Sequence, residues 1–293
     1  MSTLEQNIEL FETSCRARLL STRTMEWYDW LLTAYSEHVK EHSLEWCDAD
    51  SIDHLLAHVA AKGVSATTVH GYYRALRRFF NWLEKRHKIP ENPIDMVDAP
   101  RLPRRFPRFI EVENVEKLLH SIDADTWQDK RDRAVILFLY DTGVRASELC
   151  ELQLSNLEIK RKRVLLKNGK GGKDRYVPLG KRAMGLLTDW LQVRGKPNCG
   201  NIFIGRRGDK FQRRAITSLL RRRAKAAGIK GPIHPHAFRH GFAVAYLDNG
   251  GNIHNLQYLM GHATLRSTEI YLWSTDKRAQ DDHKRASPGD NLK

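Results

Sequence analysis

Apolar residues recur at helical spacing through the first hundred positions of the chain, most clearly near residues 25–39, 52–59 and 67–86. The stripe within 67–86 consists of Val69, Tyr72, Tyr73, Leu76, Phe80 and Leu83. Mostly off this stripe lie the basic residues Arg74, Arg77, Arg78, Lys85 and Arg86. The pattern predicts a helical N-terminal part whose longest helix buries an apolar face and exposes a basic one.

The pattern after residue 108 is mixed. Helical spacing predicts helices at 112–122, 131–140, 186–193, 215–227, 236–247 and 253–260. Two short runs, at 159–167 and 175–179, predict strands around the glycine-rich turn 168–173, because glycine allows the positive φ angles of a tight connection. The fold class is therefore predicted to be mainly α with a small β-sheet or hairpin.

The two parts are joined by residues 98–108, which contain Pro100, Pro103 and Pro107. Prolines this close together oppose both a helix and a central strand. We therefore predict a helical domain at 1–97, a basic linker at 98–108, and a second domain at 109–293 that ends in a polar tail. The linker also contains Arg104 and Arg105, so it suits contact with a phosphate backbone as well as simple connection of two domains.

Composition favours a soluble chain without covalent cross-links. Hydrophobic residues make up 41% of the 293 positions, and no run approaches the roughly 20 apolar residues that span a bilayer. The N-terminal segment lacks the apolar core of a secretory signal, so a cytoplasmic location and no membrane partner are expected. The four cysteines are far apart in sequence, which disfavours a disulfide framework and a cysteine zinc site.

Positive charge is concentrated in the second part. Residues 1–100 hold 11 Lys and Arg against 15 Asp and Glu, whereas residues 101–293 hold 38 against 20. A field of this sign attracts polyanions, so nucleic acid is the expected partner. Charge alone fits RNA, DNA, or a cationic surface without a specific role. For Arg74, Arg77 and Arg78, a solvated helix face and insertion into a DNA groove fit equally well.

Cleavage of a phosphodiester without a metal needs positive charge beside the non-bridging oxygens, a nucleophile, and an acid for the leaving oxygen. Guanidinium groups suit the oxygens because they are planar, permanently charged and bidentate. Arg145 is one candidate, because it follows an apolar helix that Gly143 ends, and Glu148 lies one turn later, where it can orient the guanidinium. A surface pair of Arg145 with Glu148 is the simpler interpretation.

A second candidate lies at 234–243, where His236, Arg239 and His240 share one face of a predicted helix. His236 suits general acid–base chemistry, and Arg239 suits a second phosphate clamp. The four-residue spacing of His236 and His240 also fits two zinc ligands. Zinc is disfavoured because Arg239 lies between them and the glutamate of an H-E-x-x-H motif is absent.

Two further segments supply a nucleophile and an acid. Gly261 permits a tight turn, His262 follows it, and Tyr271 comes nine positions later, although Tyr271 alone fits an ordinary core or surface tyrosine. Lys170 lies on the glycine-rich turn, from which a mobile lysine can protonate a leaving oxygen. A nucleotide-binding loop does not fit this turn, because the pattern G-x-x-x-x-G-K-[ST] is absent.

Taken together and in this order, these segments resemble the tyrosine recombinase (phage integrase) family. The resemblance rests on Thr-Gly-Val-Arg-Ala-Ser-Glu-Leu, Gly-Lys-Gly-Gly-Lys-Asp-Arg-Tyr-Val-Pro-Leu, His-Ala-Phe-Arg-His, Met-Gly-His and Ile-Tyr, within about residues 110–273. The helical first hundred residues resemble the family's core-binding domain less specifically, and the length resembles Xer-type and transposon-encoded members. The family is a two-domain clamp that recombines DNA at specific sites through a covalent 3′-phosphotyrosyl intermediate, in integration, excision or resolution.

The resemblance implies a catalytic set of Arg145, Lys170, His236, Arg239, His262 and Tyr271, supported by Glu148 and His240. Both arginines of the set would hold the scissile phosphate, and His262 would hydrogen-bond it. His236 would assist proton transfer, as a base to Tyr271. Lys170 would be the acid for the leaving 5′ hydroxyl, with Lys173 as its rival. The DNA-contacting residues would be Arg74, Arg77, Arg78, Arg104 and Arg105.

The resemblance also implies partners. It implies double-stranded DNA with specific recombination sites, and a homotetramer, or a heterotetramer with a paralogue, acting on two such sites. It implies no metal and no cofactor, because two arginines supply the positive charge and the phosphotyrosyl bond conserves the energy for religation. Family members of this size often end in an apolar helix that docks into a neighbouring protomer. Residues 275–283 are almost without apolar residues, so docking would use Leu272 and Trp273 or depend on DNA.

Two other functions fit parts of this pattern. A type IB topoisomerase-like enzyme uses the same residues, but acts as a monomer on unspecific DNA. A DNA-binding architectural protein or repressor has no need of a nucleophile, so the complete set of candidates disfavours it. Exchange of strands between two sites distinguishes a recombinase from a topoisomerase, and a covalent adduct with DNA distinguishes both from a binding protein.

Overall fold

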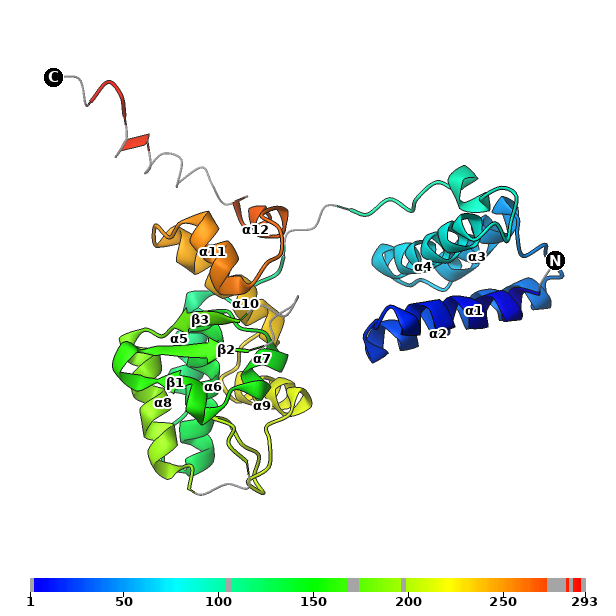
Figure 1. The fold of residues 1–293 in the computed structure, drawn as a ribbon. Coiled ribbons are helices and arrows are strands. Elements are labelled where there is room, and N and C mark those ends of the chain that lie inside the picture. The colour runs from blue at the N-terminus through cyan, green and yellow to red at the C-terminus, as the bar shows by residue number, and fades with distance from the viewer. Residues whose placement is uncertain are drawn as a thin grey trace. The chain divides into compact units, whose positions relative to one another are not determined.

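The computed structural model describes residues 3–103, 107–167, 174–195, 199–272, 283–284 and 287–290. It divides into two compact units, residues 1–105 and 106–293 (Figure 1). The described part of the first unit contains α1 (Leu4–Ala17), α2 (Thr22–Glu41), α3 (Ala49–Ala61) and α4 (Ala66–Lys85), followed by a 3-10 turn, Pro93–Met96. Within the described ranges of both units, no helix has the length and apolarity that a membrane crossing requires.

The core of the first unit forms around α4, which packs against α1, α2 and α3. All six residues of the predicted stripe are buried, together with Ala75 and Phe79. The basic residues Arg74, Arg77 and Arg78 are exposed on the other side of the helix, as the pattern predicted. The sequence analysis missed α1, whose apolar positions are sparse, although a capping box between Thr3 and Gln6 marks its start.

The second unit combines eight helices of its described part with one small sheet (Figure 1). The helices are α5 (Val112–His120), α6 (Trp127–Thr142), α7 (Ala146–Glu151), α8 (Lys181–Val193), α9 (Arg213–Ala226), α10 (Pro235–Asp248), α11 (Ile253–Met260) and α12 (Arg266–Glu269). The strands are β1 (Leu157–Glu158), β2 (Arg163–Leu166) and β3 (Arg175–Pro178), antiparallel in the order β1-β2-β3. The prediction of a mainly α fold with a small sheet is therefore confirmed.

The strand predicted at 159–167 is wrong in its first half. Ile159–Arg161 form a 3-10 turn, and Lys162 has a φ of 46°, in the left-handed region that an extended strand does not enter. These four residues reverse the chain between β1 and β2, so that Leu157 pairs with Val164. The apolar residues alone did not reveal this reversal, because a short apolar run carries little periodicity.

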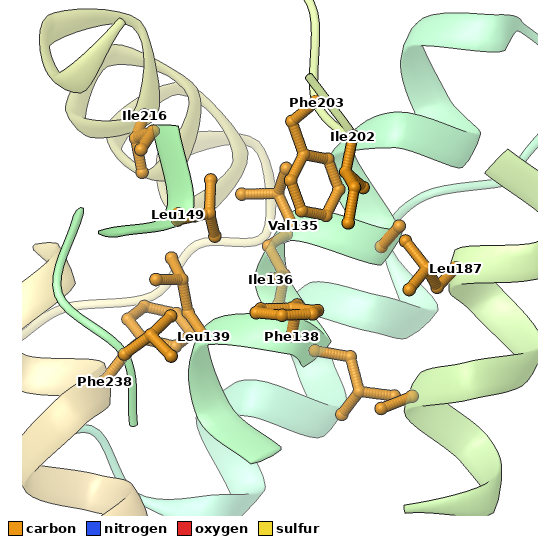
Figure 2. Close-up of a cluster of buried hydrophobic side chains, with 14 of the residues drawn as sticks. Val135, Ile136, Phe138, Leu139, Leu149, Leu187, Ile202, Phe203, Ile216 and Phe238 are labelled. Carbon is orange, nitrogen blue, oxygen red and sulfur yellow. The ribbon is translucent and has the colours of Figure 1, made fainter. Parts of the chain in front are cut away.

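Helix α6 forms the centre of the second core, and its side chains are buried nearly all round (Figure 2). Val135, Ile136, Phe138 and Leu139 are each 1% exposed or less. Figure 2 shows them among side chains from the surrounding helices and from the segment that contains Phe203. A helix that is apolar on every side is enclosed by its neighbours, and α6 packs against α5, α8, α9 and α10.

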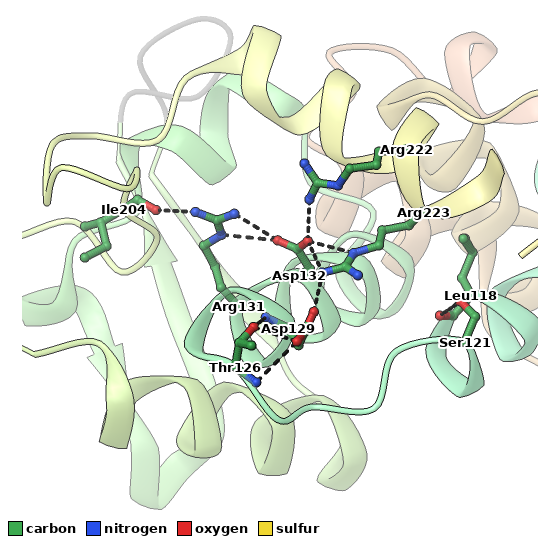
Figure 3. A network of polar contacts seen from close by, with 9 residues as sticks. All are labelled: Leu118, Ser121, Thr126, Asp129, Arg131, Asp132, Ile204, Arg222 and Arg223. Carbon is green, nitrogen blue, oxygen red and sulfur yellow. Dashed lines mark hydrogen bonds and ion pairs between the residues drawn. The ribbon is translucent and has the colours of Figure 1, made fainter. Parts of the chain in front are cut away.

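A buried ion network ties α6 to α9 (Figure 3). The carboxylate of Asp132 has no solvent exposure and accepts hydrogen bonds from Arg131, Arg222 and Arg223 at 2.8–3.3 Å. Arg223 also donates to Asp129, and Arg131 donates to the carbonyl of Ile204 at 3.2 Å. One carboxylate thus compensates several guanidiniums, which holds α9 in place against the core.

Gly143 ends α6, and two features of its position exclude a side chain. Its φ of 60° lies in the left-handed region, and an added Cβ would come within 2.2 Å of the Phe242 ring. Strain and overpacking together predict that Gly143→Ala lowers the free energy of unfolding by about 2–5 kcal/mol. Urea denaturation measures this loss. Gly185→Ala is the matched control, because space around Gly185 is open and its backbone is helical.

Candidate active site

Three arginines converge on the C-terminal end of α11, where the last carbonyl groups of a helix have no partners within the helix. Arg175, Arg239 and Arg145 donate to the carbonyl oxygens of residues 259, 260 and 261, at 2.9, 2.6 and 3.2 Å respectively. The partial negative charge at this helix end stabilises the cations. Elements that are far apart in sequence, α7, β3 and α10, thereby place three guanidiniums side by side.

Glu148 on α7 supplies the counter-charge for this cluster. It accepts two hydrogen bonds from Arg175, at 3.0 and 2.9 Å, and one from the Arg145 guanidinium at 2.9 Å. Burial alone would raise the pKa of Glu148, but the hydrogen bonds and charges of Arg175 and Arg145 prevail and lower it. The carboxylate is therefore ionised at neutral pH, and it compensates only part of the positive charge of three arginines.

Arg239 is the most enclosed of the candidate residues on α10. It is 4% exposed, and its second terminal nitrogen donates to the carbonyl of Gly143 at 2.6 Å. Burial and the charge of Arg145 lower the pKa of Arg239 to about 10, so the guanidinium remains charged at neutral pH. The side chain of Arg145 is 24% exposed, which leaves the cluster accessible to an anion from solvent.

Two histidines lie beside the arginines. His236 is exposed in the first turn of α10, and partial desolvation of its ring, with the charge of Arg239, lowers its pKa. The Nδ1 atom of His262 lies 2.9 Å from the hydroxyl of Thr268. Burial and the charges of Arg239 and Arg145 lower the pKa of His262 to about 4. Both imidazoles are therefore neutral at neutral pH.

Tyr271 is buried at the edge of this cluster. It is 2% exposed and packs in an apolar group with Phe242, Leu256 and Met260. Its hydroxyl lies 2.7 Å from Nδ1 of His240. Burial raises the pKa of Tyr271 to about 12, although the charge of the nearby Arg239 opposes the rise. The phenol is therefore neutral and enclosed in this state.

The hydrogen-bond partner of Tyr271 is His240, which the sequence analysis had placed among the supporting residues. Burial and the neighbouring His236 lower the pKa of His240 to about 4, so its ring is neutral beside the neutral phenol. Spacing on α10 gave no means of choosing between the two histidines. The choice depends on the path of the chain after α12, which brings the tyrosine back towards α10.

Comparison with known protein families identifies the family of this chain. Residues 108–278 match the phage integrase family, and residues 8–87 match the phage integrase N-terminal SAM-like domain. The chain belongs to the phage integrase family. Its members are tyrosine recombinases, enzymes that break and rejoin DNA at specific sites, so the function predicted from the sequence is confirmed.

Named relatives can be aligned with this chain over most of its length. The tyrosine recombinase XerD of Listeria innocua is 31% identical over 280 residues, 92% of this chain and 94% of the relative. The tyrosine recombinase XerC of Escherichia coli O157:H7 is 32% identical over 259 residues, 87% and 86% of the two chains. The XerH recombinase bound to a palindromic difH substrate shares the fold, with a TM-score of 0.75 and 22% identity over 99% of this chain and 86% of XerH.

Within this recombinase the structure brings together six of the sequence-predicted site residues. These are Arg145, Glu148, His236, Arg239, His240 and His262, with Tyr271 packed beside them. The predicted Lys170, with its rival Lys173, lies outside the described residues, as do Arg104, Arg105 and Trp273. Arg74, Arg77 and Arg78 belong to the other unit.

Sequence reasoning missed one member of the recombinase site, Arg175. It is 5% exposed at the start of β3, where it binds both Glu148 and the end of α11. A signal was available, because strand residues two apart share a face and Val177 was an obvious core position. Arg175 therefore had to point inward, and an inward arginine requires a buried acid.

A basic groove adjoins the recombinase site. It has a volume of about 940 Å³, lies beside α9 and the start of α10, and is lined by Arg213, Arg214, Arg221, Lys225 and His236 among others. Its basic side chains come from one face of α9, and His236 forms its border with the arginine cluster. A surface of this charge and shape suits a phosphate backbone that leads into the site.

Proposed function

We propose that this recombinase cleaves one strand of its DNA site by attack of the Tyr271 oxygen on the scissile phosphorus. The new oxygen–phosphorus bond forms as the bond to the 5′ oxygen breaks, giving a 3′-phosphotyrosyl intermediate and a 5′ hydroxyl. Attack by a 5′ hydroxyl on the phosphotyrosyl reverses the step and releases the tyrosine. The observation that carries this proposal is the convergence of Arg145 and Arg239 beside the tyrosine.

The two arginines would bind the non-bridging oxygens of that phosphate. Each guanidinium carries five N–H donors, and backbone carbonyls and Glu148 fix Arg145 and Arg239 through only some of them. Groups that are held in place before the substrate arrives stabilise developing charge without reorganising. Arg175 lies behind them and would act as a positioning residue, because it holds Glu148 and the end of α11.

Proton transfers would fall to the histidines and to a lysine. His236 is exposed beside both arginines, which suits a base for the tyrosine once a phosphate is bound. His262 would hydrogen-bond a phosphate oxygen. Lys170 would protonate the leaving 5′ oxygen, and this assignment rests on the glycine-rich motif alone, with Lys173 as its alternative.

Tyr271 would have to leave its buried position before it attacks. A hydroxyl that is enclosed with 2% exposure and bonded to His240 cannot contact a phosphate. The short α12 connects α11 to the tyrosine along the chain, so a movement of this segment, with loss of the packing of Tyr271 against α11, would free the hydroxyl. We infer that DNA binding and assembly with neighbouring protomers displace the tyrosine and thereby activate the enzyme.

The partners follow from the same proposal. The domain at 1–97 would bind DNA through Arg74, Arg77 and Arg78, and the linker at 98–108 would lie along the backbone. The XerH structure is bound to a difH substrate, and a lambda integrase dimer is bound to a COC′ core site. A homotetramer, or a heterotetramer with a paralogue, would act on two specific DNA sites in the cytoplasm. The reaction would integrate or excise a mobile element, or resolve joined DNA molecules.

A nicked substrate tests the chemistry. In DNA that is nicked one nucleotide beyond the cleavage position, cleavage releases a short fragment that carries the 5′ hydroxyl. The fragment diffuses away, so religation fails and the covalent protein–DNA adduct accumulates. We expect an adduct that resists denaturant with the unaltered chain and none with Tyr271→Phe, because phenylalanine has no attacking oxygen. Absence of any adduct with DNA that the protein binds specifically would refute strand cleavage. Transfer of strands between two such sites then distinguishes a recombinase from the topoisomerase alternative, which the named relatives do not favour.

The exposed face of α4 gives a separate prediction about DNA binding. Each phosphate contact contributes about 0.9 to the steepness with which log K for DNA falls as log salt concentration rises. In a variant with Arg74, Arg77 and Arg78 changed to alanine, we expect this slope to become shallower by roughly 2.7. Fluorescence anisotropy at several salt concentrations measures the slope. Lys62, which caps the C-terminal end of α3, belongs to the same unit, and Lys62→Ala serves as a single-charge comparison. An unchanged slope in the triple variant would place the DNA on another face.

A further inference from the structure

Four histidines gather between α2 and α3 in the first unit, far along the sequence from the recombinase site. His38 lies in the last turn of α2 and His42 caps the end of that helix, whereas His54 and His58 are one turn apart on α3. The ring centroids of His38 lie 4.3, 5.0 and 4.9 Å from those of the other three. Two pairs with this spacing on adjacent helices bring four imidazoles into one cluster, and three of them, His38, His42 and His58, hold ligand atoms close to one another.

The nitrogen atoms of this cluster are close to a metal-binding arrangement. One ligand nitrogen from each of His38, His42 and His58 lies within 4.8 Å of the others. A tetrahedral zinc ion holds its nitrogens at about 2.0–2.1 Å, which places them roughly 3.3 Å apart. The Nε2 of His38 and the Nδ1 of His54 are already 2.8 Å apart, with a single proton between them.

The orientation of His42 adds an independent observation. Its Nδ1 lies 2.9 Å from the carbonyl oxygen of His38. A carbonyl only accepts, so Nδ1 carries the proton and Nε2 carries the lone pair. A histidine whose far nitrogen donates to a backbone carbonyl is the usual arrangement of a metal ligand, because that bond fixes both the tautomer and the ring.

The surroundings leave the cluster accessible to an ion from solvent. His38 is 4% exposed, whereas His42 and His58 are half-buried and His54 is exposed, so the cluster opens to solvent on one side.

We propose that His38, His42 and His58 bind one divalent transition-metal ion, with zinc as the best match, that His54 orients His38 through their hydrogen bond, and that this ion joins α2 to α3. Imidazole ligands suit Zn²⁺, Cu²⁺ and Ni²⁺, and three imidazoles leave one position of a tetrahedral zinc ion for a ligand from solvent. The ion would be structural, because its ligands come from two helices and it links them. The ion would stabilise the domain to which we assign DNA binding. The proposal of a metal site does not depend on that assignment.

Zinc binding by the full chain tests the proposal. After treatment with a chelator and dialysis, titration with ZnCl2 is expected to show one tight site per chain. Saturation is expected to raise the melting temperature of the first unit by about 5 °C or more. The variant His42→Gln with His58→Gln is expected to bind zinc about 100-fold more weakly or worse, and to lose the thermal shift.

Three controls separate this site from other histidines and from misfolding. His70→Gln, in the same unit, and the pair His236→Gln with His240→Gln, in the other unit, are expected to keep the tight site. Circular dichroism without metal checks that the double variant folds. Cobalt in place of zinc is expected to give the intense visible bands of a tetrahedral nitrogen site with the unaltered chain. Equal zinc binding by the unaltered chain and the folded double variant, or octahedral cobalt spectra, would overturn the proposal.

Discussion

Replacing Arg239 with alanine is expected to lower the rate of strand cleavage by about 10²–10³-fold, the usual cost of removing one preorganised donor from a developing oxyanion. Arg239 is 4% exposed and bridges the carbonyls of residues 143 and 260, so it sits in a fixed place beside Tyr271. A truncated side chain leaves the phosphate with Arg145 alone. Single-turnover cleavage of a nicked DNA substrate at saturating protein measures the chemical step without the contribution of binding.

Two further variants separate charge from geometry. Arg239→Lys keeps a positive charge but is expected to recover little of the rate, because an ammonium cannot span two carbonyls and also present a planar fork to a phosphate. Arg182 lies on α8 and pairs with Glu116 on α5. The variant Arg182→Ala removes this arginine and is expected to cleave DNA normally. Normal cleavage by the folded Arg239→Ala variant would remove Arg239 from the proposed mechanism.

Replacing Asp132 with alanine is expected to destabilise the second unit by about 3–5 kcal/mol, the cost of breaking a buried ion network from one side. Its carboxylate is fully buried and compensates Arg131, Arg222 and Arg223 (Figure 3). Arg131 is itself 7% exposed, so the variant leaves a buried guanidinium without its carboxylate. Chemical denaturation followed by circular dichroism, with a separate transition for each unit, measures the loss.

The matched control is Glu116→Ala, which removes an exposed carboxylate paired with Arg182 at the surface. Solvent screens such pairs, so its effect is expected to be far smaller than that of Asp132→Ala. The Asp132 variant should also show reduced DNA affinity, because α9 carries the basic groove and loses its anchor. A stability equal to that of the unaltered chain would mean that solvent, rather than Asp132, compensates these arginines.

Helices with strong local signals were predictable from the sequence. Both ends of α11 were predicted correctly, since Asn252 caps its first turn and Gly261 ends it with a φ of 63°. The stripe of α4 was predicted for a similar reason, because apolar side chains at helical spacing must share the buried face. The turn at Ile159–Arg161 was not predictable, because three apolar and basic residues carry no local signature of a reversal.

The site was predictable in its residue types and less so in its contacts. Segments in a fixed order indicated the arginines, the histidines and Tyr271, but order in sequence says nothing of which histidine meets the tyrosine. That contact arises from packing of Tyr271 against α10, and it selected His240. The sequence analysis did not identify Arg175 as a site residue, because its strand is short and its role depends on Glu148 from a different element.

The measurement that tests the central claim most directly is identification of the residue that becomes joined to DNA. The covalent protein from a nicked substrate is digested with trypsin and nuclease, and the modified peptide is sequenced by mass spectrometry. The account predicts a nucleotide joined through its 3′ phosphate to the oxygen of Tyr271. A phosphoryl group on any other side chain, or a 5′ linkage to Tyr271, would contradict it.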